Sequence, residues 1–510
     1  MTADSPMLEK TVKKILNAKV YEAAIETPLE KAAFLSRRMN NIILIKREDL
    51  QPVFSFKLRG AYNKMTTLNE EQLAKGVICA SAGNHAQGLA EAGRLMGVKT
   101  TIVMPKTTPD IKVANVRARG GKAVLHGDAF DDALAYAKKL EEEKGLTFIH
   151  PYDDIDILAG QGTVARELLH QHRGAPIDAV FVPVGGGGLI SGMAAYIKYL
   201  QPQIKVIGVE FEESACLAAA LKARKRVTLS QVGIFADGIA VAQIGQEPWK
   251  ICKDHVDEVI TVTSDEICAA VKDIFDDTRS ITEPAGAVSV AGMKKYVERE
   301  GCTGQTLVTV SSGANTNFDR LRYIAERAEV GEHREAVLSV TIPEKPGSFK
   351  KFVSIIGKRA ITEFNYRYND HQEAKIFVGV KIASDDERHE LVEALREAGH
   401  PVLDLTENEV AKSHVRHMVG GHAPEIPHER LYRFEFPERP GALGKFLNTL
   451  GGHWNISLFH YRNHGAAYGR VLAGIQVPDE EVKEFREKLD KLGYPYWDES
   501  DNPVYSVFLA

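Results

Sequence analysis

The sequence predicts an α/β protein whose first part is built on parallel β-sheets and whose last part is a duplicated α+β module. Two observations carry this prediction. Between residues 76 and 315, short β-branched runs alternate with longer helical patterns. Beyond residue 335, two segments resemble each other at a nearly constant offset. Strands that alternate with helices are typical of βαβ units, in which helices cover both faces of a parallel sheet.

The first part contains six apolar runs that we interpret as strands. They cover residues 77–79, 100–104, 179–184, 205–209, 259–262 and 305–310. Helical patterns follow the first five, over residues 86–95, 111–119, 190–200, 215–222 and 265–276. In sheets of this kind a ligand binds beyond the carboxyl ends of the strands. We therefore expect the functional residues in the loops that follow the strands.

A charged segment at residues 318–327 marks the boundary and is expected to be helical. Beyond it, Pro346-Gly347 and Pro440-Gly441 occupy the same place in two similar segments, at an offset of 94 residues (440 − 346). Each copy has the pattern of a strand, a Pro-Gly turn, a helix, two strands, a helix and a strand, and the first helices are expected at residues 349–356 and 443–450. Units this small are expected to pair. The expected domains are residues 1–317, a linker helix at 318–335, and repeats at 336–409 and 430–502.

The composition is that of an ordinary globular protein and excludes several functional classes. Of the 510 residues, 44% are apolar and 26% charged, and the formal net charge is −5. This balance offers no basic surface, so nucleic acid is not expected as a partner. The five cysteines form no close pair, which favours a reducing compartment. The chain shows no apolar stretch of membrane-spanning length and no secretory signal, so we expect a cytoplasmic protein without membrane contact.

The first candidate motif is Ser-Phe-Lys-Leu-Arg-Gly-Ala at residues 55–61, with Lys57 among apolar neighbours. Burial would lower the pKa of the Lys57 amine and favour its attack on a carbonyl. On this motif alone, a solvated lysine is the commoner interpretation.

The second candidate motif is the turn Ser81-Ala82-Gly83-Asn84-His85, which follows a predicted strand. Backbone N–H groups at such a helix start stabilise a carboxylate or a phosphate. An ordinary helix cap by Ser81 or Asn84 is the competing interpretation.

The third candidate motif is Gly185-Gly186-Gly187-Gly188-Leu189, between a predicted strand and a predicted helix. Four successive glycines leave their N–H groups free to converge on phosphate oxygens, and the helix dipole adds to the attraction. The spacing fits neither a dinucleotide fingerprint nor a P-loop, so a monophosphate is favoured over a ligand-free turn.

Other residues give weaker signals. Ser311-Ser312-Gly313-Ala314-Asn315 ends the last predicted strand and by itself indicates a turn. The 17 histidines include no His-Glu-x-x-His, and the cysteines no Cys-x-x-Cys, so no metal site is expected. A cation near Glu210 and Glu213 stays open, with surface carboxylates as the competing interpretation.

Together and in this order, these four motifs resemble the fold-type II pyridoxal-phosphate enzymes. With the C-terminal repeats, nearly the whole chain resembles the biosynthetic threonine ammonia-lyases, or threonine dehydratases. The resemblance implies a core like that of the tryptophan synthase β-subunit with parallel sheets, followed by two ACT-like repeats of ferredoxin-like α+β fold. It also implies a homotetramer that binds pyridoxal 5′-phosphate.

The resemblance assigns roles to individual residues. Lys57 matches the lysine that forms an imine with the cofactor, Asn84 the residue that bonds the 3′-oxygen of its ring, and Ser312 the partner of the ring nitrogen. The phosphate loop matches Gly185, Gly186, Gly187, Gly188 and Leu189. The turn that receives the substrate carboxylate matches Ser81, Ala82, Gly83, Asn84 and His85. Gly238 and Glu283 match positions that line the pocket.

The implied reaction is β-elimination from L-threonine, and also from L-serine, with Lys57 as the base that takes the Cα proton. From threonine it yields 2-oxobutanoate and ammonia, the first committed step of isoleucine biosynthesis. The repeats would sense isoleucine as a feedback inhibitor and valine in the opposite direction. The candidate effector residues are Tyr366, Tyr461, Phe352 and Leu447, and core packing is the competing interpretation of the apolar pair.

Three other functions compete with this one. A serine dehydratase or serine/threonine racemase shares the core motifs but typically lacks two C-terminal repeats. A β-replacement enzyme of the cysteine synthase type fits the repeat pair less well. A non-catalytic amino-acid sensor is a different class, and the intact Lys57 and the four glycines argue against it.

Overall fold

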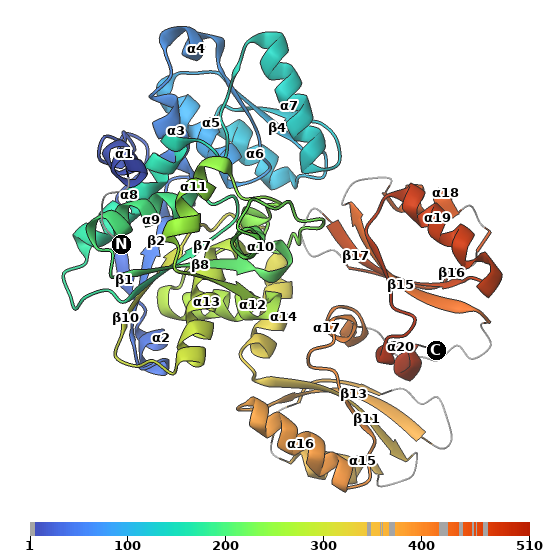
Figure 1. The fold of residues 1–510 in the computed structure, drawn as a ribbon. Helices are drawn as coiled ribbons and strands as arrows, with labels where there is room; N and C mark the ends of the chain where they lie inside the picture. Colours follow the sequence, from blue (N-terminus) through green and yellow to red (C-terminus); the bar gives the residue numbers. More distant parts are fainter. Residues whose placement is uncertain are drawn as a thin grey trace. The chain divides into compact units, whose positions relative to one another are not determined.

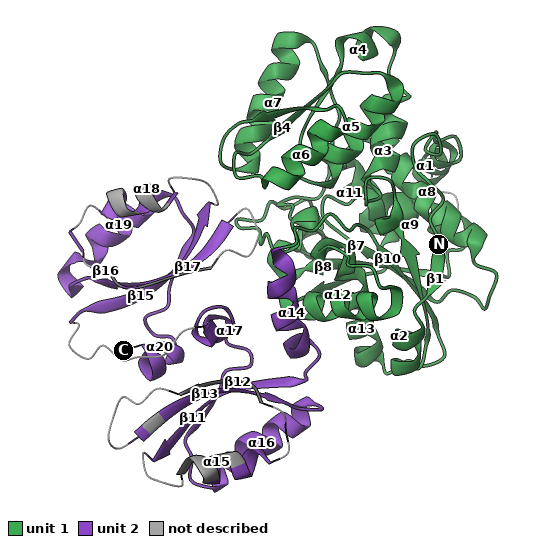
Figure 2. Cartoon of the chain, turned by 180° about the vertical axis from the view of Figure 1, so that it is seen from behind, with its two compact units in different colours: residues 1–318 green, residues 319–510 purple. Residues whose placement is uncertain are grey.

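The computed structural model describes residues 6–343, 348–357, 359, 361–366, 373–417, 427–437, 442–450, 453–454, 456–462 and 468–509. The chain separates into two compact units, residues 1–318 and 319–510, which Figure 2 colours green and purple. Across the described residues, no helix combines the length and apolar character needed to cross a bilayer.

A six-stranded sheet forms the larger half of unit 1, in the order β1-β2-β10-β7-β8-β9 (Figure 1). Its strands are β1 (Leu29–Lys31), β2 (Ile42–Arg47), β7 (Ala179–Pro183), β8 (Lys205–Phe211), β9 (Glu258–Val262) and β10 (Thr306–Ser311). All neighbours are parallel except β1, which pairs antiparallel with β2. The helices of this half are α1 (Pro6–Leu16), α2 (Ala33–Arg38), α8 (Ile155–Gln171), α9 (Gly188–Leu200), α10 (Cys216–Ala223), α11 (Gln246–His255), α12 (Ser264–Thr278) and α13 (Pro284–Glu300).

A smaller, parallel sheet forms the other half of unit 1, in the order β5-β4-β3-β6. Its strands are β3 (Val77–Ala80), β4 (Thr100–Met104), β5 (Lys122–Leu125) and β6 (Thr147–Phe148), and its helices are α3 (Lys57–Met65), α4 (Glu70–Lys75), α5 (Asn84–Met96), α6 (Asp110–Ala118) and α7 (Phe130–Lys144). Side chains alternate between faces along a strand. Val77 and Cys79 therefore pack with α3, α5 and α6, whereas Ile78 and Ala80 pack with α7.

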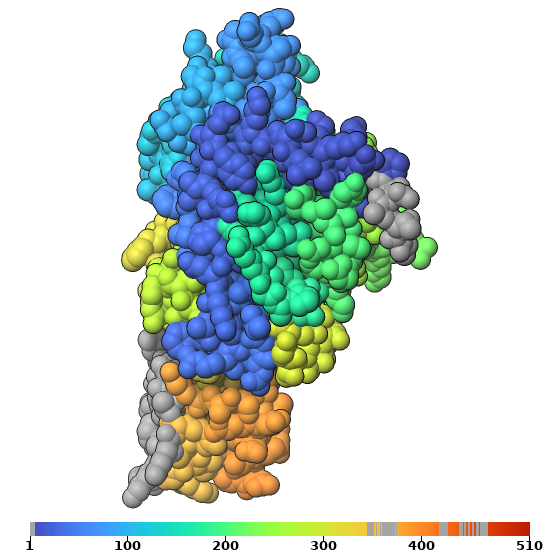
Figure 3. All heavy atoms as spheres, turned by 90° about the vertical axis from the view of Figure 1, so that its left-hand side faces the viewer, coloured from blue at the N-terminus to red at the C-terminus, as the bar shows by residue number. Residues whose placement is uncertain are grey.

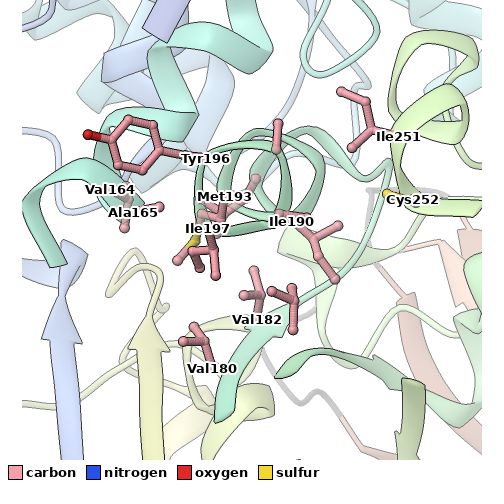
Figure 4. Close-up of a cluster of buried hydrophobic side chains, with 14 of the residues drawn as sticks. Val164, Ala165, Val180, Val182, Ile190, Met193, Tyr196, Ile197, Ile251 and Cys252 are labelled. Carbon is pink, nitrogen blue, oxygen red and sulfur yellow. The ribbon is translucent and has the colours of Figure 1, made fainter. Parts of the chain in front are cut away.

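A buried apolar cluster fixes the start of α9 over the larger sheet, as Figure 4 shows. Val180 and Val182 of β7 point toward Ile190 and Met193 of α9, and further contacts come from α8 and α11. The glycine loop lies between this strand and this helix, so packing on both sides holds it in place. The N-terminal helix α1 also packs here, since its Val12 belongs to this buried cluster. Figure 3 shows the dark-blue N-terminal residues beside green residues on the surface.

Unit 2 begins with α14 (Arg320–Gly331) and continues as two four-stranded antiparallel sheets. The first repeat contains β11 (Glu335–Pro343), α15 (Ser348–Ile356), β12 (Ile361–Tyr366), β13 (Glu373–Lys381), α16 (Asp385–Glu397) and β14 (Val402–Asp404). After α17 (Glu409–Ser413), the second contains β15 (Glu429–Pro437), α18 (Ala442–Leu450), β16 (Ile456–Arg462), β17 (Tyr468–Gln476), α19 (Val482–Leu492) and β18 (Tyr496–Asp498), and α20 (Pro503–Phe508) follows. The strand–helix order predicted from the repeat is confirmed in both copies.

Candidate active site

Lys57 is the first residue of α3, and its side chain is half-buried. The Nζ atom donates a hydrogen bond to the Pro151 carbonyl oxygen at 3.0 Å and lies 5.3 Å from the centre of the Phe56 ring. Burial lowers the pKa of Lys57 to about 8, and the negative charge of Glu283 only partly opposes this shift. A lysine with this pKa supplies the unprotonated amine that imine formation requires.

A buried charge network anchors the first turn of α3, two residues after Lys57. Arg59 donates to Glu48 at 2.7 and 2.8 Å and to Glu167 at 2.5 and 2.9 Å, and Lys46 donates to Glu167 at 2.6 Å. Burial alone would raise the pKa of Glu48, but the Arg59 guanidinium lowers it below the ordinary value. Two cations balance two carboxylates, so the network carries no net charge. It connects α3 to β2 and α8 and fixes the backbone that carries Lys57.

The glycine loop has no room for side chains. A Cβ atom at Gly185 would lie 2.8 Å from the Ile239 backbone, and one at Gly186 would lie 2.2 Å from the Tyr152 ring. Gly187 has φ of +89°, which side-chain-bearing residues rarely adopt. No backbone acceptor in the described chain takes the N–H groups of this loop, and α9 begins at Gly188. These N–H groups and the helix N-terminus are available to an anion.

Asn84, Glu283 and Asn315 form a hydrogen-bonded row beside the loop. Asn84 Nδ2 donates to Glu283 Oε1 at 2.5 Å, and Asn315 Nδ2 donates to Asn84 Oδ1 at 2.7 Å. Gly238 lies next to this row, since a Cβ there would be 3.5 Å from Glu283 Oε1. Ser312 is buried, and its hydroxyl donates to the Ala285 carbonyl oxygen at 3.3 Å. The loops after β3 and β10 and the start of α13 thus meet at one place.

The turn predicted to receive a carboxylate begins at the carboxyl end of β3. Ser81 Oγ accepts a hydrogen bond from the Gly83 N–H at 3.3 Å, and a Cβ at Gly83 would meet no atom within 4 Å. His85 Nε2 bonds the Ile149 carbonyl oxygen at 2.9 Å, and burial lowers the His85 pKa to about 3. His85 is therefore neutral and has a structural contact.

One pocket brings together every residue predicted to hold the cofactor. Its lining includes Lys57, Asn84, Gly185, Gly186, Gly187, Gly188, Leu189, Gly238, Glu283 and Ser312. Of the carboxylate turn only Asn84 lines this pocket, whereas Ser81, Ala82, Gly83 and His85 do not. Six further residues line the pocket and were not predicted from the sequence: Phe56, Tyr152, Pro183, Ile239, Val241 and Ala285. Tyr152 lies in the loop between β6 and Asp154, the N-cap residue of α8, and this position is the signal that could have identified it as a pocket residue.

The candidate effector residues lie in unit 2. The side chains of Tyr366, Leu447 and Tyr461 lie outside the described residues. Phe352 is fully buried in the apolar cluster of the first repeat, which favours core packing for this residue.

Glu210 and Glu213, the two candidate cation ligands, do not belong to a group of metal-binding residues in the described ranges. In the described ranges, no three His, Cys, Asp or Glu residues gather as metal ligands would. Glu210 accepts from the N–H groups of Leu217 and Ala218 at 2.8 Å each and so caps α10.

Comparison with known proteins places the chain in a family. Residues 20–313 match the pyridoxal-phosphate dependent enzymes, and residues 326–415 and 420–509 each match the C-terminal regulatory domain of threonine dehydratase. The L-threonine dehydratase biosynthetic IlvA of Burkholderia multivorans is 57% identical over 98% of this chain and 99% of its own length. The Escherichia coli protein of the same name is 55% identical over 98% of this chain and 97% of its own. The chain belongs to the biosynthetic threonine dehydratase family.

Solved structures agree with this family. Threonine deaminase isoform 2 from Solanum lycopersicum, in its processed form, aligns with a TM-score of 0.62 and 47% identity over 64% of this chain and 94% of that chain. Serine racemase from Dictyostelium discoideum aligns with a TM-score of 0.55 and 30% identity over 61% of this chain and 98% of its own. The predicted fold class and the predicted dependence on pyridoxal phosphate are confirmed for this dehydratase family member.

Proposed function

We propose that this protein is a threonine ammonia-lyase that converts L-threonine to 2-oxobutanoate and ammonia, and that it also accepts L-serine. In a cell this is the first committed step of isoleucine biosynthesis. The observation that carries the proposal is that Lys57, the glycine loop and Ser312 line one pocket in a chain of the threonine dehydratase family.

The pocket residues fit pyridoxal phosphate. The glycine loop, which would clash with Ile239 and Tyr152 if it carried side chains, offers N–H groups to the phosphate. Lys57 offers an amine of lowered pKa to the aldehyde. Asn84 and Ser312 would hold the ring oxygen and the ring nitrogen.

When bound, pyridoxal phosphate supplies an electron sink that makes the Cα proton of a joined amino acid acidic. Lys57 would take this proton, since its amine, with a pKa of about 8, is partly unprotonated near neutral pH. The β-hydroxyl group leaves as water, with a proton that balances the one taken from Cα, and water then hydrolyses the enamine product to 2-oxobutanoate and ammonia. The turn at residues 81–85, which reaches the pocket at Asn84, would orient the substrate carboxylate through backbone N–H groups. His85 stays neutral and bonded to Ile149, so it moves no proton.

The test compares the purified protein with a Lys57→Ala variant. We expect visible absorbance of the bound cofactor and 2-oxobutanoate production from threonine in the wild type, and loss of both in Lys57→Ala. Lys75→Ala is a matched control, because Lys75 is an exposed lysine paired with Glu71. A wild-type protein without absorbance or turnover would support the sensor function instead. Racemised threonine without 2-oxobutanoate would support the racemase.

We also propose that isoleucine inhibits the enzyme through unit 2 and that valine opposes it. Support comes from the two matches to a threonine dehydratase regulatory domain. We expect Tyr461→Ala to lose inhibition by isoleucine and to keep the basal rate, in assays with and without isoleucine. Unchanged inhibition would remove Tyr461 from the effector site, and the same assay applies to Tyr366→Ala and Leu447→Ala.

A homotetramer and a cytoplasmic location complete the proposal. Sedimentation of the purified protein tests the first. The five cysteines, which are all free thiols, support the second.

A further inference from the structure

Asn315 connects two segments that both reach the pocket. The chain around Ser312 pairs with the chain before Lys57: the Phe56 N–H donates to the Ser312 carbonyl at 3.3 Å, and the Ala314 N–H donates to the Phe54 carbonyl at 2.9 Å. Asn315 continues this pairing with its side chain, because its Nδ2 donates to the Val53 carbonyl oxygen at 2.8 Å. The second hydrogen of the same Nδ2 atom goes to Asn84 Oδ1 at 2.7 Å.

The direction of this row of hydrogen bonds is fixed at both ends. A main-chain carbonyl such as that of Val53 only accepts, so Asn315 must turn its NH₂ group toward it. That NH₂ group then requires an acceptor from Asn84, which presents its oxygen. The Asn84 nitrogen is left facing Glu283, whose Oε1 accepts a hydrogen bond from it at 2.5 Å.

The Asn84 nitrogen is consequently the atom that lies toward the pocket. A Cβ at Gly238, which lines the pocket, would be 3.7 Å from Asn84 Nδ2, and one at Gly313 would be 3.2 Å from it. Glu283 takes one hydrogen of this nitrogen, and the other is available to an acceptor oxygen on a bound ring. An Asn84 amide turned the other way would offer an oxygen to that acceptor and repel it.

We propose that Asn315 is a positioning residue that holds the Asn84 amide with its nitrogen toward the cofactor ring. The proposal rests on the proposed function, since it takes the cofactor to be the pocket's ligand. Only asparagine suits position 315, because the role needs two donors on one atom at this reach. Aspartate has the shape without the donors, and serine has a single donor.

The experiment is a double-mutant cycle on cofactor affinity. The dissociation constant of pyridoxal phosphate is measured by fluorescence titration of the cofactor-free protein for the wild type, Asn84→Ala, Asn315→Ala and the double variant. We expect Asn315→Ala to weaken binding about tenfold, or about 1.4 kcal/mol, in the wild-type background. In the Asn84→Ala background we expect a further change of less than about twofold, because the residue through which Asn315 acts is gone.

Two further variants separate positioning from folding. Thr316→Val is the matched control, because the buried Thr316 hydroxyl on the same turn has no hydrogen-bond partner among the described residues, and we expect unchanged affinity. Asn315→Ser keeps one donor and is expected to lose less affinity than Asn315→Ala. It replaces Asn315→Ala in the cycle if circular dichroism shows that the alanine variant is unfolded.

Each other outcome overturns the inference in a distinguishable way. An equal loss from Asn315→Ala in both backgrounds would mean that Asn315 acts only through the backbone pairing. Unchanged affinity in Asn84→Ala would remove Asn84 from the ring contact and Asn315 with it, while the proposed function stands. A wild-type protein that binds no pyridoxal phosphate would overturn the proposed function as well.

Discussion

The two repeats of unit 2 share one fold but enclose different interiors. Their strand orders correspond, β12-β13-β11-β14 and β16-β17-β15-β18, and β11 and β15 lie 94 residues apart (429 − 335). The described core of the first is aliphatic apart from Phe352. The described core of the second contains Tyr432, Phe434, Phe436, Phe446, Trp454, Phe485 and Tyr494. The order of apolar and polar positions, more than the identity of the side chains, therefore sets this fold.

Equivalent positions show how the difference arises. At a constant spacing of 94 residues, an aliphatic residue of the first repeat corresponds to an aromatic residue of the second. These equivalent positions are Leu338 and Tyr432, Val340 and Phe434, Ile342 and Phe436, and Leu391 and Phe485. Between the repeats, residues from both, including Phe377 and Leu472, share a third buried cluster. Each repeat keeps its own core and contributes to a common one.

The largest loss of stability is expected at the one equivalent position where both described cores contain an aromatic residue. Phe352 and Phe446 are both fully buried, and Phe446 lies 4.9 Å from Phe436 and 5.2 Å from Phe434 between ring centres. Replacing a buried phenylalanine with alanine costs about 3–5 kcal/mol. Aromatic pairs add about 0.5–1.5 kcal/mol. We expect Phe446→Ala and Phe352→Ala each to destabilise its repeat by about 3 kcal/mol or more, as measured by hydrogen exchange of β15 and β11. A much smaller loss at either position would contradict a packed ring there.

A smaller effect is expected where α14 and α17 meet β17 of the second repeat. Glu409 of α17 accepts hydrogen bonds from Arg327 of α14 at 2.8 and 3.1 Å, and it also accepts from Arg470 of β17. Glu409→Gln leaves two cations without their carboxylate, and we expect a loss of about 2 kcal/mol. Hydrogen exchange should rise in α14 and β17 together. A rise confined to one of them would mean that Glu409 is not a shared contact.

The contribution of Glu409 to stability is also expected to depend on pH. Burial opposes ionisation of Glu409, yet the charges of Arg327 and Arg470 hold its pKa well below the ordinary 4.5. The carboxylate therefore contributes stability above pH 4.5, and this contribution is lost as the pH falls through the lowered folded-state value. The difference in urea midpoint between wild type and Glu409→Gln should be constant from pH 7 to 5 and shrink in stronger acid. A difference that grows in acid would show the opposite sign.

The smallest expected effect tests one equivalent pair of polar residues. Tyr494 donates from its hydroxyl to the Ala442 carbonyl oxygen at 3.2 Å, whereas both ring nitrogens of the buried His400 lack a partner in the described chain. Tyr494→Phe removes a hydrogen bond and should cost about 1 kcal/mol. His400→Phe removes unpaired buried polar atoms and should be neutral or stabilising. A loss at His400→Phe as large as at Tyr494→Phe in urea unfolding would contradict this contrast.

Much of the fold could be predicted because its signals are local. The strand expected at residues 100–104 matches β4, and the helix expected at residues 443–450 matches α18 within one residue. The prediction missed β2, whose neighbour β10 lies more than 250 residues further along the chain. It did not separate unit 1 into two sheets either, because strand pairing at such distances leaves no pattern in either strand.

The candidate site divides in the same way. Lys57 and the glycine loop stand out because each motif is contiguous, and both line the pocket. The partners of Arg59 could not be predicted, since Glu167 lies 108 residues away. Asn315 was visible within a turn, but its contact with Asn84 spans 231 residues. Motifs identify what a residue can do, and only the fold shows which residue holds it in place.

The charge network behind Lys57 affects how the stability of this site changes with temperature. Keeping Lys46, Arg59, Glu48 and Glu167 away from water is costly at room temperature, because ionised groups are strongly hydrated. Their hydration becomes less favourable as temperature rises, so the cost falls on warming. The network therefore loses less of its strength on warming than a comparable set of neutral contacts. A warmed enzyme is expected to keep its lysine anchored while other parts of the molecule begin to open.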